Sequence, residues 1–215
     1  EIADDIVNTV QNYSENPGFL ENSDLENYTV IERDPVCIDY REHNVCGMGP
    51  PSSGGVAVAQ ILKIVEKFNL KSLGYKNPKS WQVIGDASRL AFADRDRYLA
   101  DSDFVDVPMN GLLDHEYLKK RSKKIELGRR TENIEAGNPS QEVTYNYADD
   151  NSLELQSTTH ISIYDKYGNA LSMTSSIENA FGSRLFTKSG FLLNNQLTDF
   201  SFRNEIDGKL ISNRL

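Results

Sequence analysis

The sequence predicts an α+β fold, because two kinds of hydrophobic period occupy different parts of the chain. Residues 58–68 and 79–99 repeat apolar side chains at helical spacing, whereas residues 158–176 alternate with a period of two. At 215 residues the chain suits one or two domains. A chain of this size buries roughly 70% of its unfolded surface, which allows a sizeable core.

The first 40 residues predict helices followed by strands. Residues 1–14 predict an amphipathic helix. Ser23, with Glu26 three residues later, has the spacing of a capping box, so we expect Ser23 to be the N-cap of a second helix. Residues 28–40 predict strands that Pro35 interrupts.

Two long helices and a short one are expected next. The turn-rich segment 50–55 leads into the first helix, and residues 79–99 form the second, with Ala87 and Ala91 on a face suited to close packing. Residues 114–125 predict a short basic helix. The apolar stripe that we expect to face the core in the first helix consists of Val58, Ile61, Leu62, Val65 and Phe68.

Residues 128–157 predict an exposed linker, because they lack apolar periodicity and contain the turn formers Gly-Asn-Pro-Ser. Exposed segments of this kind are where proteolytic cleavage concentrates. We therefore expect a helix-rich part over 1–157 and a β-rich part over 158–215.

From residue 158 the alternation predicts a β-hairpin. Its turn is expected at 165–168, and its second strand at about 169–176. Every short loop length brings residues 175–177 beside Thr158. Loops of four, three and two residues would place it opposite Ser175, Ser176 and Ile177, respectively.

Composition excludes several classes of partner. The net charge of -9 argues against nucleic acid, because affinity for nucleic acid comes from cationic contacts. The mean hydropathy is -0.53, and no run approaches the ~20 apolar residues of a membrane helix, so we expect no membrane span. No zinc-type spacing occurs among His43, His115 and His160, and we expect neither a metal site nor a cofactor.

Cys37 and Cys46 flank a segment that predicts two short strands around a turn. We expect two free thiols facing each other, with a disulfide as the alternative, because two cysteines do not make a disulfide framework. Neither state of the cysteines decides the cellular compartment, and the amphipathic start at residues 1–7 does not decide it either. The sequence leaves open whether the protein is periplasmic or secreted, or cytoplasmic.

Thr158 carries the strongest chemical hypothesis. A threonine hydroxyl is a poor nucleophile unless a base lies beside it, and an N-terminal threonine supplies that base with its own α-amine. Scission of the bond between Ser157 and Thr158 would create such a residue at the start of the strand. The alternative is an ordinary β-branched strand residue.

Six segments in collinear order carry a family resemblance: 48–55 (Met-Gly-Pro-Pro-Ser-Ser-Gly-Gly), 91–95, 158–162 (Thr-Thr-His-Ile-Ser), 165–170, 181–183 and 190–200. Together they resemble the γ-glutamyltransferase family of N-terminal-nucleophile hydrolases. The resemblance implies a four-layer αββα fold, autocatalytic cleavage before the nucleophilic threonine, and transfer of a γ-glutamyl group from glutathione-like amides to water or an amine. It also implies that some relatives are acylases of glutaryl-type side chains.

The resemblance makes Thr158 the nucleophile and the Ser157–Thr158 bond the cleavage site. Ser176 stands where the family usually has a threonine whose hydroxyl supports the nucleophile. Gln196 and Asp199 match donor-binding positions, and a carboxylate suits the α-ammonium of the donor.

Glu178 departs from the family, which usually has asparagine there. Its carboxylate can accept a hydrogen bond from an ammonium, but the change also suggests a glutaryl-type amide acylase. We expect Asn194 and Asn195 to shape the loop, because asparagine favours turns. His160 is expected to be a strand residue and not a catalytic base.

The predicted function is therefore a γ-glutamyl transferase or hydrolase. Its partners would be a small-molecule γ-glutamyl donor, an amine or water acceptor, and the large and small subunits cut from one precursor. The alternatives are the acylase and a non-catalytic scaffold homologue. We expect the chain to be a central fragment, because the family's carboxylate-binding arginine and oxyanion-hole glycines would fall before Glu1 and after Leu215.

Overall fold

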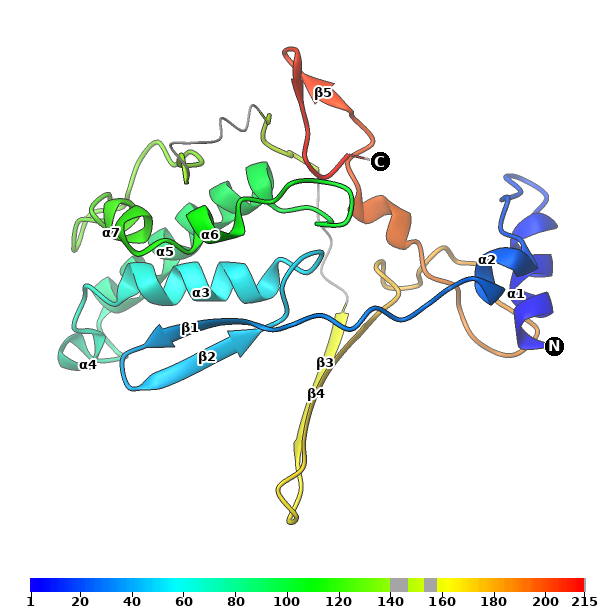
Figure 1. The fold of residues 1–215 in the computed structure, drawn as a ribbon, viewed down its shortest axis with the longest axis horizontal. Helices are drawn as coiled ribbons and strands as arrows, with labels where there is room; N and C mark the ends of the chain where they lie inside the picture. Colours follow the sequence, from blue (N-terminus) through cyan, green and yellow to red (C-terminus); the bar gives the residue numbers. More distant parts are fainter. Residues whose placement is uncertain (140–146, 153–157, 215) are drawn as a thin grey trace. The chain divides into compact units, whose positions relative to one another are not determined.

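The computed structural model describes residues 1–139, 147–152 and 158–214 and contains both helices and antiparallel β-hairpins (Figure 1), which confirms the α+β class. The chain divides into two compact units. Residues 1–31 and 152–200 form what we call the hairpin unit, and residues 32–151 and 201–215 form the helical unit. The two-stranded sheets of the described residues do not by themselves show a four-layer sandwich.

Local sequence explains where the long helices of the helical unit begin. Helix α5 starts with Pro78 at a position where the missing N–H costs nothing, and the Asn77 side chain accepts a hydrogen bond from the backbone N–H of Lys79. Asp114 caps α7 by accepting from the N–H of Tyr117 at 2.8 Å. The helices are α3 (Gly54–Val65), α4 (Leu70–Leu73), α5 (Pro78–Tyr98), α6 (Met109–Leu112) and α7 (His115–Ser122).

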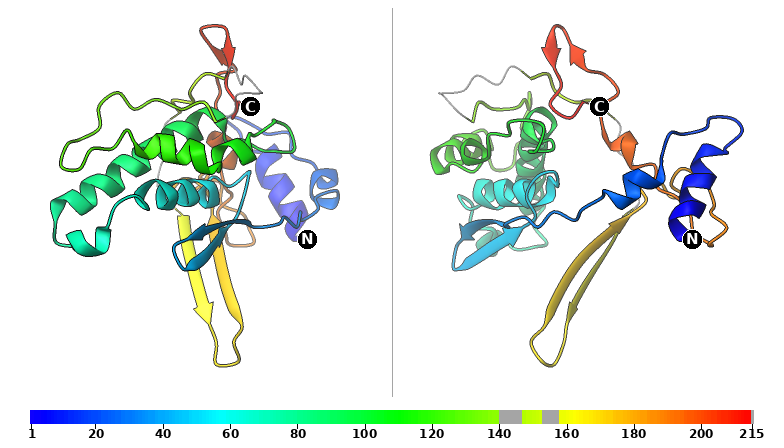
Figure 2. Two further views of the ribbon diagram at one scale, coloured as in Figure 1. Left: turned by 60° about the vertical axis from the view of Figure 1, so that its left-hand side comes forward. Right: turned by 45° about the vertical axis from the view of Figure 1, so that its right-hand side comes forward.

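The core of the helical unit lies where α3, α5 and α7 meet, and α3 and α5 run side by side in both views of Figure 2. Val83, Ala87 and Leu90 of α5 are 0% exposed, as is Ile64 of α3. Burying a side chain such as leucine or isoleucine in this way contributes roughly 1.5–3 kcal/mol. The predicted face of α5 is confirmed at Ala87 and at the fully buried Ala91.

The predicted core stripe of the first long helix is confirmed in part: Val65 is buried and Ile61 and Phe68 pack against the core, but Val58 is not part of it. Val58 is 48% exposed, whereas Val56 and Gln60 are each 1% exposed. Because α3 packs against α5, α7 and the hairpin β1–β2, the buried face is set by these neighbours. A buried glutamine is tolerated there because its amide donates to the carbonyl oxygen of Leu112 at 2.9 Å.

A buried ion pair joins α5 to α7. Asp94 is 0% exposed and accepts from Arg121 Nη2 at 2.8 Å, from the Tyr117 hydroxyl at 2.6 Å and from the backbone N–H of Gly137 at 2.8 Å. Burial raises the pKa of the Asp94 carboxyl, and the Arg121 guanidinium opposes that rise. A β-carbon at Gly137 would lie 2.3 Å from the Tyr117 hydroxyl, so this approach requires glycine.

The described parts of the predicted linker over 128–157 include many exposed residues, but single contacts attach them to the helices. Arg121 donates to the carbonyl oxygen of Glu135, and Ala148 also lies opposite Ile211 in a parallel bridge. Ile211, 1% exposed, follows the small hairpin of β5 (Glu205–Ile206) and β6 (Lys209–Leu210). The packing arises from single contacts and not from a hydrophobic period, which is why the sequence pattern missed it.

Strands β1 (Val36–Tyr40) and β2 (His43–Gly47) form the hairpin predicted around the cysteines. The register places Cys37 opposite Cys46, with Cα atoms 4.1 Å apart, and the two are joined in a disulfide. The expectation of free thiols is therefore wrong, because the register brings the sulfurs within bonding reach. Residues 28–35 lie outside any strand, so β1 starts only after Pro35.

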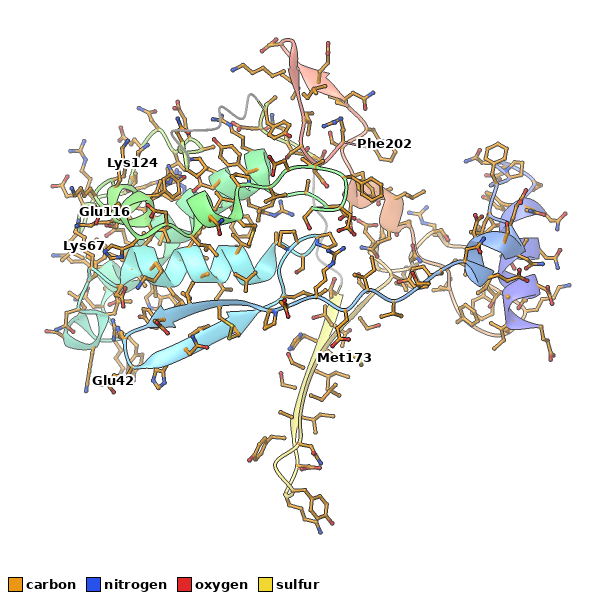
Figure 3. All side chains as sticks on the ribbon, in the orientation of Figure 1. Glu42, Lys67, Glu116, Lys124, Met173 and Phe202 are labelled. Atoms are coloured by element: carbon orange, nitrogen blue, oxygen red, sulfur yellow. A yellow bond between two sulfur atoms is a disulfide. The ribbon has the colours of Figure 1, made fainter. Side chains whose placement is uncertain are left out.

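The hairpin unit contains α1 (Ile2–Gln11), α2 (Asn22–Glu26), β3 (Thr158–Tyr164), β4 (Ala170–Ser176) and the 3₁₀ turn η1 (Gln196–Asp199). The capping box of α2 is formed by Glu21 and Asp24 and not by the predicted Ser23 and Glu26: the Glu21 N–H donates to Asp24 Oδ2 at 2.8 Å. Both faces of β3 are exposed, as is nearly all of β4, including Met173 at 44% (Figure 3).

Helix α1 is attached to the loop before η1 through one carboxylate. Asp5 accepts from the Ser189 hydroxyl and from its backbone N–H, both at 2.6 Å, and from the N–H of Lys188 at 3.3 Å. The hydrogen bonds from Ser189 hold the pKa of Asp5 below its ordinary value.

Candidate active site

The hairpin β3–β4 places Thr158 directly opposite Ser176, which selects the three-residue loop among the predicted registers. Asp165 donates its N–H to the carbonyl oxygen of Asn169 at 3.0 Å and closes the turn. Gly168 has φ +89° there, a conformation that glycine adopts without strain. The predicted second strand is confirmed as Ala170–Ser176.

The two hydroxyls at the open end of the hairpin are hydrogen-bonded. Thr158 Oγ1 donates to Ser176 Oγ at 3.1 Å. Ser176 Oγ also accepts the backbone N–H of Glu178 at 2.9 Å. The serine oxygen is therefore held from two sides, and it stands beside the predicted nucleophile, as the resemblance implies.

Glu178 has a backbone conformation that is rare for a residue with a β-carbon. Its φ is +67°, in the left-handed region, which costs of order 1–3 kcal/mol for such residues. Strain of this kind persists only where the surroundings hold it. Its carboxylate oxygen Oε2 accepts a short hydrogen bond from Asn195 Nδ2.

The remaining predicted residues lie together on η1. Gln196 Nε2 donates to Asp199 Oδ2, and the Gln196 N–H donates to Asn194 Oδ1 at 2.9 Å. Asn194 therefore shapes the loop, as expected. The structure thus brings Thr158 and Ser176 together at the hairpin end and pairs Gln196 with Asp199 on the turn.

Asn195 is the residue whose importance the sequence pattern understated. It does shape the loop, but its side chain also contacts Glu178, 17 positions away. No local pattern encodes such a pair. The sequence held one indication of this pair. A carboxylate replaces the family's usual asparagine at position 178, and a half-buried carboxylate needs a hydrogen-bond donor beside it.

His160 is a strand residue, as predicted. Its Nδ1 lies 2.8 Å from Thr174 Oγ1, and its Nε2 lies 3.2 Å from the hydroxyls of both Ser162 and Ser172. The ring is thus surrounded by hydroxyl groups of the hairpin. Ser157, the other member of the predicted cleavage site, lies outside the described residues.

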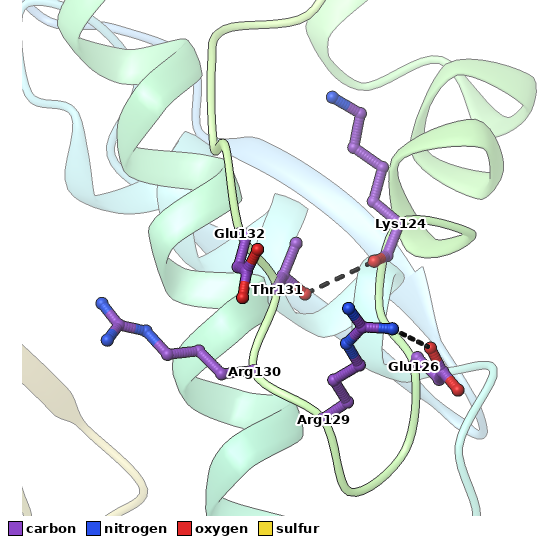
Figure 4. Close-up of a pocket in the computed structure, with 6 residues that line it drawn as sticks. All are labelled: Lys124, Glu126, Arg129, Arg130, Thr131 and Glu132. Carbon is purple, nitrogen blue, oxygen red and sulfur yellow. Dashed lines mark hydrogen bonds and ion pairs between the residues drawn. The ribbon is translucent and has the colours of Figure 1, made fainter.

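The helical unit has a hollow of about 180 Å³ that contains none of the predicted site residues (Figure 4). Two internal contacts cross it: Arg129 Nη1 lies 3.9 Å from Glu126 Oε2, and Thr131 Oγ1 donates to the carbonyl oxygen of Lys124 at 3.4 Å. The residues that line it are Lys124, Glu126, Arg129, Arg130, Thr131 and Glu132.

Across the described parts of the chain, no group of three or more His, Cys, Asp or Glu residues is placed to hold a metal ion. Over the same residues, no helix has the length and apolar character that crossing a membrane requires.

Known proteins match this chain over most of its length. A family model described as gamma-glutamyltranspeptidase matches residues 1–214. The chain is 37% identical over 201 residues to the glutathione hydrolase proenzyme of Escherichia coli (strain K12), a match that covers 93% of this chain and 33% of that protein. The chain therefore spans about a third of the length of this curated relative.

Two solved structures are also similar. The gamma-glutamyltranspeptidase of Helicobacter pylori matches with a TM-score of 0.56 and 37% identity over 61% of this chain and 37% of that chain. A cephalosporin acylase from Bacillus halodurans matches with a TM-score of 0.76 over 99% of this chain and 35% of that chain. At 24% identity, the second likeness concerns the fold alone.

Proposed function

Because the chain belongs to the gamma-glutamyltranspeptidase family, we propose that the protein is a γ-glutamyl transferase and hydrolase whose nucleophile is Thr158. The observation that carries the proposal is the hydrogen bond of 3.1 Å from Thr158 Oγ1 to Ser176 Oγ. A hydroxyl at the first residue of a strand, already oriented by a second hydroxyl, is the arrangement that an N-terminal nucleophile needs.

The nucleophile is generated by cleavage of the precursor. The Thr158 hydroxyl attacks the carbonyl carbon of Ser157, and the amide nitrogen leaves as the α-amine of Thr158, which converts the peptide bond into an ester. Water hydrolyses this ester. The products are a large subunit ending at residue 157 and a small subunit that begins with Thr158, within a four-layer αββα fold. The likeness to the acylase over 99% of the chain supports that fold.

The mature enzyme uses the hydroxyl and the amine of one residue. Thr158 Oγ1 attacks the γ-carbonyl of the donor, and the α-amine accepts the hydroxyl proton. The same amine then protonates the leaving amine as the C–N bond breaks, leaving a γ-glutamyl ester on Thr158. Water or an acceptor amine attacks that ester and regenerates the hydroxyl. Ser176 Oγ orients the attacking oxygen through its hydrogen bond.

The donor's α-ammonium is held by carboxylates of the hairpin unit. Asp199 and Glu178 accept charge-assisted hydrogen bonds from it, and Gln196 orients Asp199. The carboxylate of Glu178, where the family usually has asparagine, strengthens the attraction for an ammonium and disfavours an acidic group nearby. A glutaryl amide lacks that ammonium and leaves these carboxylates without a cation.

A denaturing gel of the full-length protein tests the nucleophile. We expect two bands, with Thr158 as the first residue of the smaller one, and a single uncut band for Thr158→Ala. A wild-type protein that stays uncut on long incubation would instead be the non-catalytic scaffold.

Two substrates compared side by side test the donor. We expect γ-glutamyl-p-nitroanilide to be hydrolysed at least ~100-fold more efficiently than glutaryl-p-nitroanilide, because loss of the ammonium leaves two charged groups unpaired. Equal turnover of the two would contradict the roles of Glu178 and Asp199 and favour the acylase.

A further inference from the structure

We propose that Asn195 is a positioning residue for the donor site, and that it acts by holding Glu178 in its left-handed conformation. This inference rests on the proposed function, because Glu178 is a donor ligand there. Asn195 is half-buried and lies directly before η1, whereas Glu178 lies two residues after the end of β4. One residue therefore joins the two segments that carry the donor ligands.

Asn195 holds the backbone of both neighbours of Glu178, one through its own N–H and the other through its side-chain oxygen. The Asn195 N–H donates to the carbonyl oxygen of Ile177 at 3.3 Å. Asn195 Oδ1 accepts the N–H of Asn179 at 3.0 Å. With both flanking peptide groups held, the turn at 178 cannot relax to negative φ without breaking a hydrogen bond.

The side-chain amide fixes the carboxylate itself. Asn195 Nδ2 donates to Glu178 Oε2 and to Thr198 Oγ1, the latter at 2.8 Å. The Thr198 hydroxyl donates in turn to the carbonyl oxygen of Asn195 at 2.8 Å. Because Oδ1 is engaged by an N–H, the amide can present only its nitrogen to the carboxylate. Both ends of the amide are thus used.

The contacts of Glu178 extend this effect to the nucleophile. The Glu178 N–H donates to Ser176 Oγ, which accepts from Thr158 Oγ1. Turning residue 178 out of its left-handed conformation would therefore remove one of the two donors on Ser176. Asn195 need not touch the substrate to influence both binding and attack, but the carboxylate is the group that it contacts directly.

The chain contains a matched pair for comparison at the far end of the same hairpin. Asn169 Nδ2 donates to Asp165 Oδ2 at 2.8 Å, and this hydrogen bond holds the pKa of Asp165 below its ordinary value. It is the same asparagine-to-carboxylate contact in the same unit, but it involves no predicted site residue. Asn169→Asp is therefore the control for Asn195→Asp.

The test is an isosteric exchange in the full-length protein, assayed with γ-glutamyl-p-nitroanilide. Asn195→Asp replaces the amide donor by a carboxylate facing Glu178, and we expect KM to rise about 30-fold with kcat lowered less than about fivefold. The double variant Glu178→Gln/Asn195→Asp again pairs an amide donor with a carboxylate, but the amide is now at position 178 and the carboxylate at position 195. We expect it to recover kcat/KM to within about fivefold of Glu178→Gln alone.

Donor discrimination separates positioning from a merely structural role. Asn195→Ala adds no charge, and we expect it to lower the preference for γ-glutamyl over glutaryl amide about tenfold, because the carboxylate that recognises the ammonium is no longer held. A structural defect would lower turnover of both substrates alike. This variant also decides the matter if Asn195→Asp yields no soluble protein.

The outcomes are distinguishable. Asn169→Asp should leave KM and kcat within about twofold of wild type. If the wild type is active and Asn195→Ala keeps its KM and its donor preference, the inference about Asn195 is wrong and the proposed function stands. If the wild type is uncut, or Thr158→Ala remains active, the proposed function itself is wrong.

Discussion

The two units of this protein differ in the burial of the polar side chains that matter most to each. In the helical unit, Asp94 and Arg121 have side chains 1% and 2% exposed, and their hydrogen bonds join α5, α7 and the segment around Gly137. In the hairpin unit, Thr158 is exposed at a strand end, and Val7 is the one buried hydrophobic side chain among its described residues. The buried core thus lies mainly in the helical unit, and the proposed chemistry lies in the hairpin unit.

The difference has a physical cause. A buried charge must be paired and hydrogen-bonded, so Asp94 and both Nη atoms of Arg121 are engaged within the protein, and only Arg121 Nε is buried without a partner. The polar groups at the end of β3–β4 remain accessible, and each is oriented by a neighbouring side chain. Accessible but oriented groups can act on a substrate, whereas fully engaged buried groups mainly fix the fold. The comparison can be tested by changing one unit at a time.

The largest effect is expected from Thr158→Ala. Removing the hydroxyl removes the attacking atom, so we expect hydrolysis of γ-glutamyl-p-nitroanilide to fall by at least about a thousandfold, with no cleavage of the precursor. Thr158→Ser keeps a hydroxyl and should retain cleavage. Thermal unfolding of the helical unit should be the same in both variants, since the change lies in the other unit. An active alanine variant would remove Thr158 from the mechanism.

Arg121→Met should have the largest effect on stability. It leaves Asp94 buried without its cation, and it also removes donors to the carbonyl oxygens of Leu90 and Glu135. We expect a loss of about 3–5 kcal/mol in the free energy of unfolding, measured with urea on the full-length protein.

Two companion variants sharpen this measurement. Asp94→Asn combined with Arg121→Met removes both charges and should recover part of the loss. Arg33→Met breaks a surface pair with Asp103 and should cost less than about 1 kcal/mol. Equal losses for Arg33→Met and Arg121→Met would contradict the special role of the buried pair, because both ion pairs lie in the helical unit and differ in exposure.

Asp199→Asn is expected to raise KM for the γ-glutamyl donor about 30-fold, because a neutral amide loses the charge-assisted hydrogen bond to the α-ammonium. Stability should change by less than about 0.5 kcal/mol, since Asp199 is exposed. Steady-state kinetics and thermal unfolding of the same preparation check both statements. A large fall in stability with unchanged KM would place Asp199 with the structural groups.

The smallest effect is expected from a fall in pH, which should weaken the hydrogen bonds between Asp5 of α1 and Ser189. The pKa of Asp5 is lowered in the folded state by hydrogen bonds from Ser189, so its contribution is present above the unfolded value of about 3.9 and is lost as pH falls through the folded pKa. Amide exchange at Ser189, with the intrinsic pH dependence removed, should therefore accelerate as the pH falls below about 3.9. Asp5→Asn should abolish this pH dependence. An unchanged profile in that variant would show that Asp5 does not hold the loop.

Local patterns predicted much of the fold. The periods of α3 and α5 and the alternation through Thr158–Tyr164 depend on residues close in the chain, so the positions of these helices and of this strand followed from the sequence. The division into subunits at 157–158 remains a prediction. It concerns the covalent chain, and the compact units of the structure do not divide there.

The sequence by itself determined the family, the nucleophile hypothesis and the choice of partners for Thr158, because motifs and hairpin registers depend on short separations. The structure fixed the hairpin register that puts Ser176 opposite Thr158, the position that the family resemblance had indicated. Only the tertiary structure decided that Cys37 bonds Cys46 and that Val56 and Gln60, not Val58, are buried on α3. It also decided that Asn195 holds Glu178. These outcomes depend on which distant segments pack together, and a periodic pattern shows that a face is buried without showing what covers it.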